Sequence, residues 1–170
     1  MFTVVTGRYN NETWEASLNY RNKKKLACIY APSFKLSPII DLNSPVFVIE
    51  MNNSINKIMG IGLIKNKLVT DKVYKVQTDS NYNRYIYIGE HHIPRCVLND
   101  YNPFLVYVLE EILFKGYTHS KRGLGLTKIP EKVLKFDICE GLDIKKEIRN
   151  TFVYHYRDKI INKNNNISKN

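Results

Sequence analysis

The hydrophobic pattern of the chain predicts a β-sheet in its first half. Residues 46–51 and 58–64 are almost wholly apolar, and the polar segment 52–57 separates them, which is the pattern of a β-hairpin. Strands that are apolar on both faces are expected in the centre of a sheet. Gly60 and Gly62 fall on the same face of the second strand, where they leave room for a packed side chain, a bend or a ligand.

Shorter patterns predict further strands on either side of this hairpin. Residues 2–6 and 26–30 are short apolar segments, and the first of them is rich in β-branched residues. Residues 72–77 and 82–89 predict two more strands joined by a turn. Strict alternation along the last strand places on one of its faces Asn83, Tyr85 and Tyr87.

Helical patterns dominate the second half of the chain. Asn102 and Pro103 are typical of a helix start, an N-cap followed by proline at the first helical position, and Gly116 marks the end of that helix. Residues 14–25 fit a helix or an extended segment, and Pro130 predicts a short helical turn. A last amphipathic helix is predicted near the C-terminus, with a buried side formed by Ile144, Ile148 and Phe152.

These elements predict one α+β domain over residues 1–161. Its strands would form a curved mixed or antiparallel β-sheet or a small β-barrel, with helices flanking it. A chain of 170 residues is long enough for one ordinary hydrophobic core. Residues 162–170 are rich in asparagine and lysine, and a flexible tail is expected there.

Composition adds a strong positive charge to this picture. The chain carries 26 Lys and Arg residues against 16 Asp and Glu residues, which gives a net charge of +10. With 44% hydrophobic and 25% charged residues, the protein is expected to be globular rather than disordered. A positive excess of this size favours nucleic acid, an anionic surface or an acidic protein as a partner, or else serves only solubility.

Several protein classes are not expected from this sequence. No run of 18 or more apolar residues occurs, which argues against a membrane protein. Cys28, Cys96 and Cys139 are far apart and lack neighbours at zinc spacing, so neither a disulfide framework, nor a metal site, nor another cofactor is indicated. Unpaired thiols fit a reducing compartment, and we expect an intracellular protein of the cytoplasm or nucleus.

The segment 116–128 concentrates groups that need an anionic partner. Its three glycines let backbone N–H groups approach a ligand closely. Its polar side chains are suited to phosphate, and they include His119, Ser120, Lys121, Arg122 and Lys128. The GxxxxGK[ST] spacing of a P-loop is absent, and the segment follows a helix, so its charge comes from side chains. The segment predicts a phosphate- or nucleic-acid-binding loop, and the alternative is a solvated surface turn.

An aromatic surface is the second candidate for a binding site. Tyr82, Tyr85 and Tyr87 surround Arg84 in a predicted strand, and Trp14 is the only tryptophan of the chain. Aromatic rings interleaved with cations stack on exposed bases while the cations hold phosphates. The alternative for the tyrosines is an ordinary strand, and for Trp14 it is a place in the core.

Histidine chemistry is the third candidate. His91 and His92 are adjacent, so in a strand they face opposite sides and would not bind one metal ion together. Either of them could pair with His119 as a general acid and base, and no other catalytic residue is indicated. Glu50, a carboxylate among apolar residues, would pair with a cation such as Arg84 or accept a hydrogen bond from a base.

One hairpin of the chain resembles that of a known superfamily. Residues 46–64, with Gly60 and Gly62 in the second strand and Trp14 upstream, are similar to the PUA-like superfamily, in particular to its EVE and YTH branches. The resemblance implies a small, strongly bent β-barrel with flanking helices that binds RNA or modified DNA bases, often in an aromatic cage. The further cage tryptophans of YTH proteins have no counterpart, and the segment after Asn99 does not align. The bias toward Asn, Lys and Ile is similar to that of proteins from large DNA viruses, which act inside a host cell.

These observations together predict a non-catalytic nucleic-acid-binding protein. The basic loop would contact phosphates, and base stacking is expected from Trp14, Tyr85 or Tyr87. RNA is favoured over DNA, because unpaired bases stack well on the face of a sheet. The alternatives are an enzyme that acts on nucleotides or nucleic acid with a histidine acid or base, and a protein-interaction module whose basic face meets an acidic protein.

Overall fold

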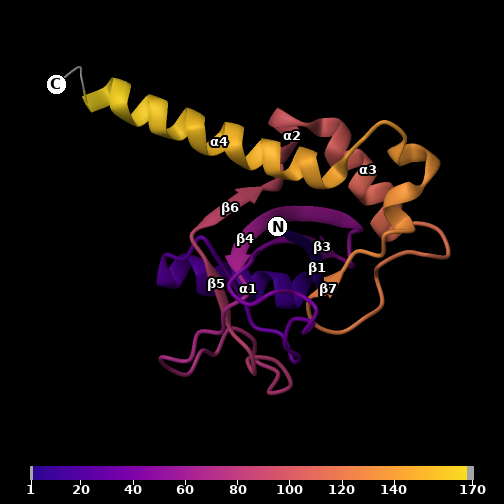
Figure 1. The fold of residues 1–170 in the computed structure, drawn as a ribbon. Helices are drawn as coiled ribbons and strands as arrows, with labels where there is room; N and C mark the ends of the chain where they lie inside the picture. The colour runs from indigo at the N-terminus through magenta and orange to yellow at the C-terminus, as the bar shows by residue number, and fades with distance from the viewer. Residues whose placement is uncertain (1, 168–170) are drawn as a thin grey trace.

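The computed structural model describes residues 2–167, and the side chains of residues 2–157. Its centre is a mixed five-stranded sheet in the order β6-β4-β3-β1-β7 (Figure 1). The strands are β1 (Thr3–Tyr9), β3 (Pro45–Asn52), β4 (Lys57–Lys65), β6 (His91–Pro94) and β7 (Thr127–Lys128). The hairpin that the apolar runs predict is β3–β4, and it lies inside the sheet as expected.

Strand direction explains the position of the first helix. β1 and β3 are parallel, and the other pairs of this sheet are antiparallel. Parallel strands need a crossover connection, and α1 (Asn11–Lys24) forms part of it. The side chain of Asn10 caps α1 by accepting a hydrogen bond from the backbone N–H of Thr13, at 2.8 Å. The segment that fits either a helix or an extended conformation is therefore a helix.

Three more helices cover the opposite face of the sheet. They are α2 (Arg95–Tyr101), α3 (Pro103–Phe114) and α4 (Ile144–Ile167), and Figure 1 shows them on the side away from α1. Asn102 caps α3 as predicted, because its side chain accepts from the backbone N–H of Leu105 at 3.0 Å. Two 3₁₀ turns, η1 (Val133–Lys135) and η2 (Asp137–Cys139), precede α4, and η1 is the short turn expected after Pro130. None of the helices in the described part of the chain has both the length and the apolar character of a membrane span.

Side chains of the sheet alternate between two cores. Phe47 and Ile49 belong to the larger core, which lies under α2, α3 and α4. Val46 and Val48 belong to a smaller core on the other face of the sheet. Glu50 continues the Val46–Val48 row, because alternate residues of a strand share a face. A carboxylate in the middle of the sheet therefore points toward the side of α1.

A second, two-stranded sheet covers this smaller core. It pairs β2 (Cys28–Tyr30) with β5 (Tyr87–Gly89) in antiparallel register. Only Glu90 separates β5 from β6, so one segment of the chain passes from the small sheet into the large one. The fold is α+β, as predicted, but no closed barrel is found among the residues that the structure describes.

One predicted strand is wrong, and another is right only over Tyr87–Gly89, which form β5. Residues 72–77 form no strand, and residues 82–86 form none either. Asn83 accounts for the absence of a strand in both segments. Its backbone is left-handed (φ +64°), and its side chain forms hydrogen bonds with backbone groups that a neighbouring strand would otherwise use. The amide oxygen accepts from the N–H groups of Val76 and Gln77 at 2.9 and 3.0 Å, and the amide nitrogen donates to the carbonyl of Gln77 at 2.8 Å.

The C-terminal helix follows its prediction in position but not in length. Ile144, Ile148 and Phe152 are all buried, as the spacing predicts. α4 continues through Ile167, into the segment for which the sequence predicts a flexible tail, and its last turns extend beyond the sheet in Figure 1. Residues 168–170 of that predicted tail lie outside the described part of the chain.

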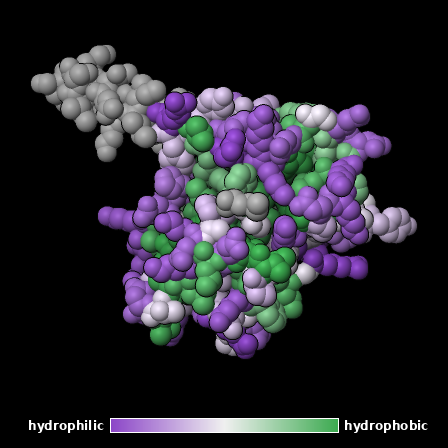
Figure 2. All heavy atoms as spheres, viewed as in Figure 1, coloured by the Kyte–Doolittle hydropathy of each residue, from purple (hydrophilic) through white to green (hydrophobic). Residues whose placement is uncertain are grey.

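Loops rather than helices shape the lower half of the molecule as drawn. Hydrophilic side chains cover much of the face in Figure 2, and apolar ones gather in its lower half. The loops of residues 31–44 and 66–86 lie there in Figure 1 and carry several exposed apolar side chains, among them Phe34, Ile39, Leu42 and Val73. These loops border the pocket described below.

Candidate functional site

A buried ion-pair cluster lies between the sheet and α1. The carboxylate of Glu50 is completely buried, and three side chains from three other elements bind it. Arg21 of α1 forms an ion pair with Oε1. The Tyr30 hydroxyl on β2 donates to the same oxygen at 2.8 Å, and Nε2 of His92 on β6 lies 2.9 Å from Oε2. Glu50 therefore pairs with a cation, as one of the two sequence interpretations expects, but with Arg21 rather than Arg84.

Electrostatics keep this cluster charged. Burial by itself raises the pKa of Glu50, but the charges and hydrogen bonds of Arg21 and His92 outweigh it and lower the pKa to about 2. Burial also raises the pKa of the Tyr30 phenol well above its ordinary value, so this phenol stays protonated and donates to Glu50. The cluster is thus an ionised carboxylate held by the guanidinium of Arg21 and the hydroxyl of Tyr30, with the His92 ring beside it.

Aromatic rings enclose the guanidinium of Arg21. Its central carbon lies 5.3 Å from the ring centroid of Trp14 and 5.7 Å from that of Tyr30. The Trp14 ring also meets the Tyr9 ring edge to face, with centroids 5.3 Å apart. Trp14 is thus a wall of the ion-pair cluster, which accounts for its presence without a ligand.

The two glycines of β4 make space for this cluster. A Cβ added to Gly62 would lie 2.0 Å from the Tyr30 hydroxyl, and one added to Gly60 would lie 2.7 Å from Nε2 of His92. Of the three uses that the sequence leaves open for these glycines, the structure shows the packed side chain.

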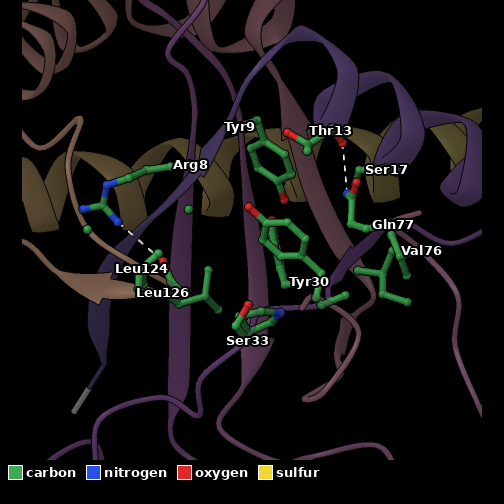
Figure 3. A pocket seen from close by; sticks show the side chains of 17 residues that line it. Arg8, Tyr9, Thr13, Ser17, Tyr30, Ser33, Val76, Gln77, Leu124 and Leu126 are labelled. Carbon is green, nitrogen blue, oxygen red and sulfur yellow. Dashed lines mark hydrogen bonds between the residues drawn. The ribbon is translucent and has the colours of Figure 1, made fainter. Parts of the chain in front are cut away.

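A pocket lies beside the cluster, between β1, α1, β2 and the Gly-rich loop. Its cavity measures about 110 Å³. Figure 3 shows Tyr9 and Tyr30 at its centre, Arg8 at one side and Gln77 with Ser17 at the other. The remaining wall comes from residues 31–33, from Tyr82 and from residues 123–126. Segments that are far apart in the sequence thus share one concave site.

Arg8 fixes the Gly-rich loop to β1. Its Nε donates to the carbonyl of Ser120, its Nη1 to the carbonyl of Gly125 at 3.4 Å, and its Nη2 to the hydroxyl of Thr127 at 2.6 Å. Gly123 lies against the guanidinium with a left-handed backbone (φ +131°), and an added Cβ would be 3.3 Å from the central carbon. The positive φ therefore favours glycine there, and the space beside the guanidinium is tight.

The cations of the loop lie next to the pocket and not in it. Arg122 and Lys128 are exposed, and Lys121 is half-buried with its carbonyl accepting from Asn53 Nδ2 at 3.0 Å. Within the described residues none of these three forms an ion pair. Arg122 directly precedes Gly123 of the pocket wall, so its backbone lies next to the pocket.

Two of the predicted loop contacts have local structural roles instead. Ser120 is buried, its N–H donates to the carbonyl of Leu113 at 2.7 Å, and its carbonyl accepts from Arg8. The Nδ1 atom of His119 accepts from the backbone N–H of Lys121 at 3.3 Å. Both residues thus help to shape the turn that follows α3.

The predicted aromatic strand does not form a surface. Tyr87 is buried in the smaller core, where its hydroxyl accepts from the backbone N–H of Leu36 at 3.0 Å. Its expected stacking on a base is therefore wrong. Tyr85 is half-buried, with Lys35 Nζ 5.5 Å from its ring, and Arg84 is exposed. The tyrosine of this segment that lines the pocket is Tyr82, which is 38% exposed.

The histidines are held apart from one another and from the pocket. His92 faces the ion-pair cluster, whereas the His91 ring packs against Tyr156 of α4 with centroids 4.5 Å apart, so the two face opposite sides as expected. The loop of His119 leads into β7, at the opposite edge of the sheet from β6. The structure therefore does not bring the expected acid–base pair together. None of these histidines lines the pocket, and no metal-binding group of three or more ligands occurs within residues 2–157.

Comparison with known proteins adds no further constraint on function. No family model, curated protein or solved structure matches this chain. The PUA-like resemblance therefore stays a prediction.

Sequence reasoning missed the residues that form the pocket floor. Arg8 and Tyr9 end β1, two residues or more beyond the strand predicted over residues 2–6, and Tyr30 ends β2. Nothing in their spacing indicates that the two strand ends meet. One feature of the sequence could have indicated Arg8. Arginine is scarce in this lysine-rich chain, and its guanidinium offers several hydrogen-bond donors in a fixed planar arrangement, so an arginine directly after Gly7 is a candidate for a specific contact.

Proposed function

We propose that this protein binds single-stranded nucleic acid and takes one unpaired base into the pocket between β1, β2 and the Gly-rich loop. The observation that carries the proposal is the shared pocket. The rings of Tyr9, Tyr30 and Tyr82 line it together with two glycines of the basic loop, whose cations form no ion pair within the described residues. Rings and cations side by side are the combination by which proteins hold bases and phosphates.

The size of the pocket supports a small flat ligand. Pockets for drug-sized molecules measure roughly 300–1,000 Å³, whereas this cavity measures about 110 Å³. Such a space suits one ring system rather than a large molecule. Gln77 lies at the edge of the pocket, with its side-chain nitrogen donating to the carbonyl of Thr13 at 3.0 Å. Its amide oxygen is then positioned to accept a hydrogen bond from the edge of a base.

Charge supports a polynucleotide ligand rather than an uncharged one. The chain carries a net charge of +10, and Arg122 adjoins the pocket wall without a carboxylate partner in the described residues. A strand whose base enters the pocket would pass its phosphates along this rim. RNA is the favoured ligand, because RNA in cells presents unpaired bases in loops and ends.

The base contact is tested by fluorescence anisotropy with labelled single-stranded RNA and DNA of the same sequence. We expect Tyr82→Ala to weaken binding, because a stacked base contributes about 1–3 kcal/mol, or roughly 5- to 150-fold in affinity. Tyr154→Ala is the matched control, since Tyr154 is an exposed tyrosine of α4 on the other face of the sheet. Equal effects of the two substitutions, or no binding by the wild-type protein, would contradict the proposal.

The phosphate contact is tested by the dependence of the same binding on salt. For a single strand the slope of log K against log[salt] is about −0.7 per phosphate contact. Arg122→Ala should therefore make the slope less negative by about 0.7. The control is Arg149→Ala, an exposed arginine of α4, which should leave the slope unchanged. If Arg122→Ala leaves the slope unchanged, Arg122 does not contact a phosphate and the proposed role of the loop is wrong.

A further inference from the structure

Arg8 is a cation in the pocket wall that lacks a counter-ion. Its three hydrogen bonds go to two carbonyl oxygens and one hydroxyl, all of them neutral. No carboxylate in the described part of the chain forms an ion pair with it. Burial lowers the pKa of Arg8, and no neighbouring acid offsets that effect. A charge taken out of water is usually paired with an opposite charge, and the described residues supply none for Arg8.

Unused donors point to the place where an anion would bind. A guanidinium carries five N–H groups, and the three hydrogen bonds of Arg8 leave one on each terminal nitrogen. Gly123 and Gly125 also line the pocket, and their backbone N–H groups donate to nothing within the described residues. Guanidinium groups and the backbone N–H groups of glycine-rich turns commonly bind phosphate oxygens in proteins.

We propose that Arg8 and the amides of Gly123 and Gly125 form a phosphate subsite inside the pocket. The inference rests on the proposed function, which places a base against the tyrosine rings, and adds that a phosphate of the same nucleotide unit occupies the Arg8 side. The chemistry is shared by a terminal phosphate monoester and by an internal phosphodiester. The exposed cations of the loop would then follow the rest of the strand.

Isothermal titration of the wild-type protein with nucleosides and with the matching nucleoside 5′- and 3′-monophosphates tests the subsite. We expect the preferred monophosphate to bind about 10- to 100-fold more tightly than its nucleoside, which is the range for hydrogen bonds to a charged group. Short oligonucleotides with a 5′-phosphate or a 5′-hydroxyl end then separate the two sources. A preference for the phosphorylated end indicates a monoester, and equal binding of the two indicates an internal diester.

Variants separate the subsite from the anchoring of the loop. Arg8→Gln should reduce the ratio of monophosphate to nucleoside affinity to about one, and Arg8→Lys should keep part of it. Thr127→Val is the matched control, because it removes one hydrogen bond between Arg8 and the loop and leaves the charge in place. That variant should retain the wild-type ratio.

The outcomes distinguish this inference from the function on which it rests. A wild-type protein that binds a nucleoside as tightly as its monophosphate overturns the subsite and leaves the base pocket intact, and this result does not depend on any variant folding. A ratio that Arg8→Gln leaves unchanged also overturns it, since Arg8 then only anchors the loop. Ribose 5-phosphate, which has no base, binding as tightly as the nucleoside monophosphates supports the subsite and overturns the base pocket.

Discussion

At the scale of single residues, Glu50 joins four elements of the fold. Its carboxylate on β3 binds Arg21 from α1, Tyr30 from β2 and His92 from β6. The same Tyr30 lines the pocket, so the position of the pocket floor depends on this buried charge. Breaking a buried pair by removing one partner is costly, because the other charge stays buried without compensation.

We therefore expect Glu50→Gln to destabilise the protein by about 3–5 kcal/mol at pH 7. The substitution keeps the shape of the side chain and removes only the charge that compensates Arg21. Unfolding in urea, followed by tryptophan fluorescence, measures the free energy of unfolding. Glu12→Gln, at an exposed position in the first turn of α1, is the control and should change stability little.

The same residue sets a pH dependence of stability. The pKa of Glu50 lies near 4.5 as its ordinary value and at about 2 in the folded protein, so the folded state favours the ionised form. That contribution is fully present above pH 4.5 and is lost as the pH falls toward 2. Its size is about 3 kcal/mol. In Glu50→Gln the free energy of unfolding should therefore fall less between pH 4.5 and pH 2 than it does in the wild type. The same pH dependence of stability in both proteins would contradict the assignment.

At the scale of elements, close backbone contact joins the small sheet to the large one. A Cβ added to Gly89 of β5 would lie 2.1 Å from the carbonyl oxygen of Leu63 on β4 and 2.7 Å from Sγ of Cys28. A strand backbone inside a sheet has no room to move aside. The approach of β5 to β4 thus requires glycine at position 89.

Gly89→Ala should accordingly cost about 1–3 kcal/mol, the usual effect of overpacking, and lower the melting temperature. Gly116→Asn is a suitable control, because Gly116 has open space around it and a left-handed backbone (φ +73°) that asparagine tolerates. Thermal unfolding followed by circular dichroism compares the two. Equal melting temperatures would mean that the two sheets are not in contact at this point.

Local patterns predicted the elements that depend on neighbouring residues. The β3–β4 hairpin follows from its two apolar runs, α3 from its Asn-Pro cap, and α4 from its four-residue spacing. In the segment 72–86 the apolar and polar residues do alternate, and this pattern predicts strands. The Asn83 side chain, however, forms hydrogen bonds with the backbone groups that strand pairing would use. Local propensity does not reveal such a competition between a side chain and a strand.

At the scale of the whole molecule, the site depends on which strand ends meet. The basic loop was recognised from its residues, and the structure places part of it in the pocket wall. The aromatic residues that the sequence predicts for stacking, Trp14, Tyr85 and Tyr87, do not line this pocket. Tyr9 and Tyr30 reach the pocket only because the small sheet folds back onto the face of β1 and β3, a contact between distant segments that residue spacing does not encode. Tyr87 shows the converse, since an alternating tyrosine became part of the core.

The most direct test of the base pocket is nuclear magnetic resonance of the ¹⁵N-labelled protein during titration with single-stranded RNA. The proposed function predicts chemical-shift changes at the backbone amides of Arg8, Tyr9, Ser33 and Tyr82 and of residues 123–126, with smaller changes on the face covered by α3 and α4. Shift changes that cluster on α3 and α4, or no changes at all at RNA concentrations above that of the protein, would contradict it.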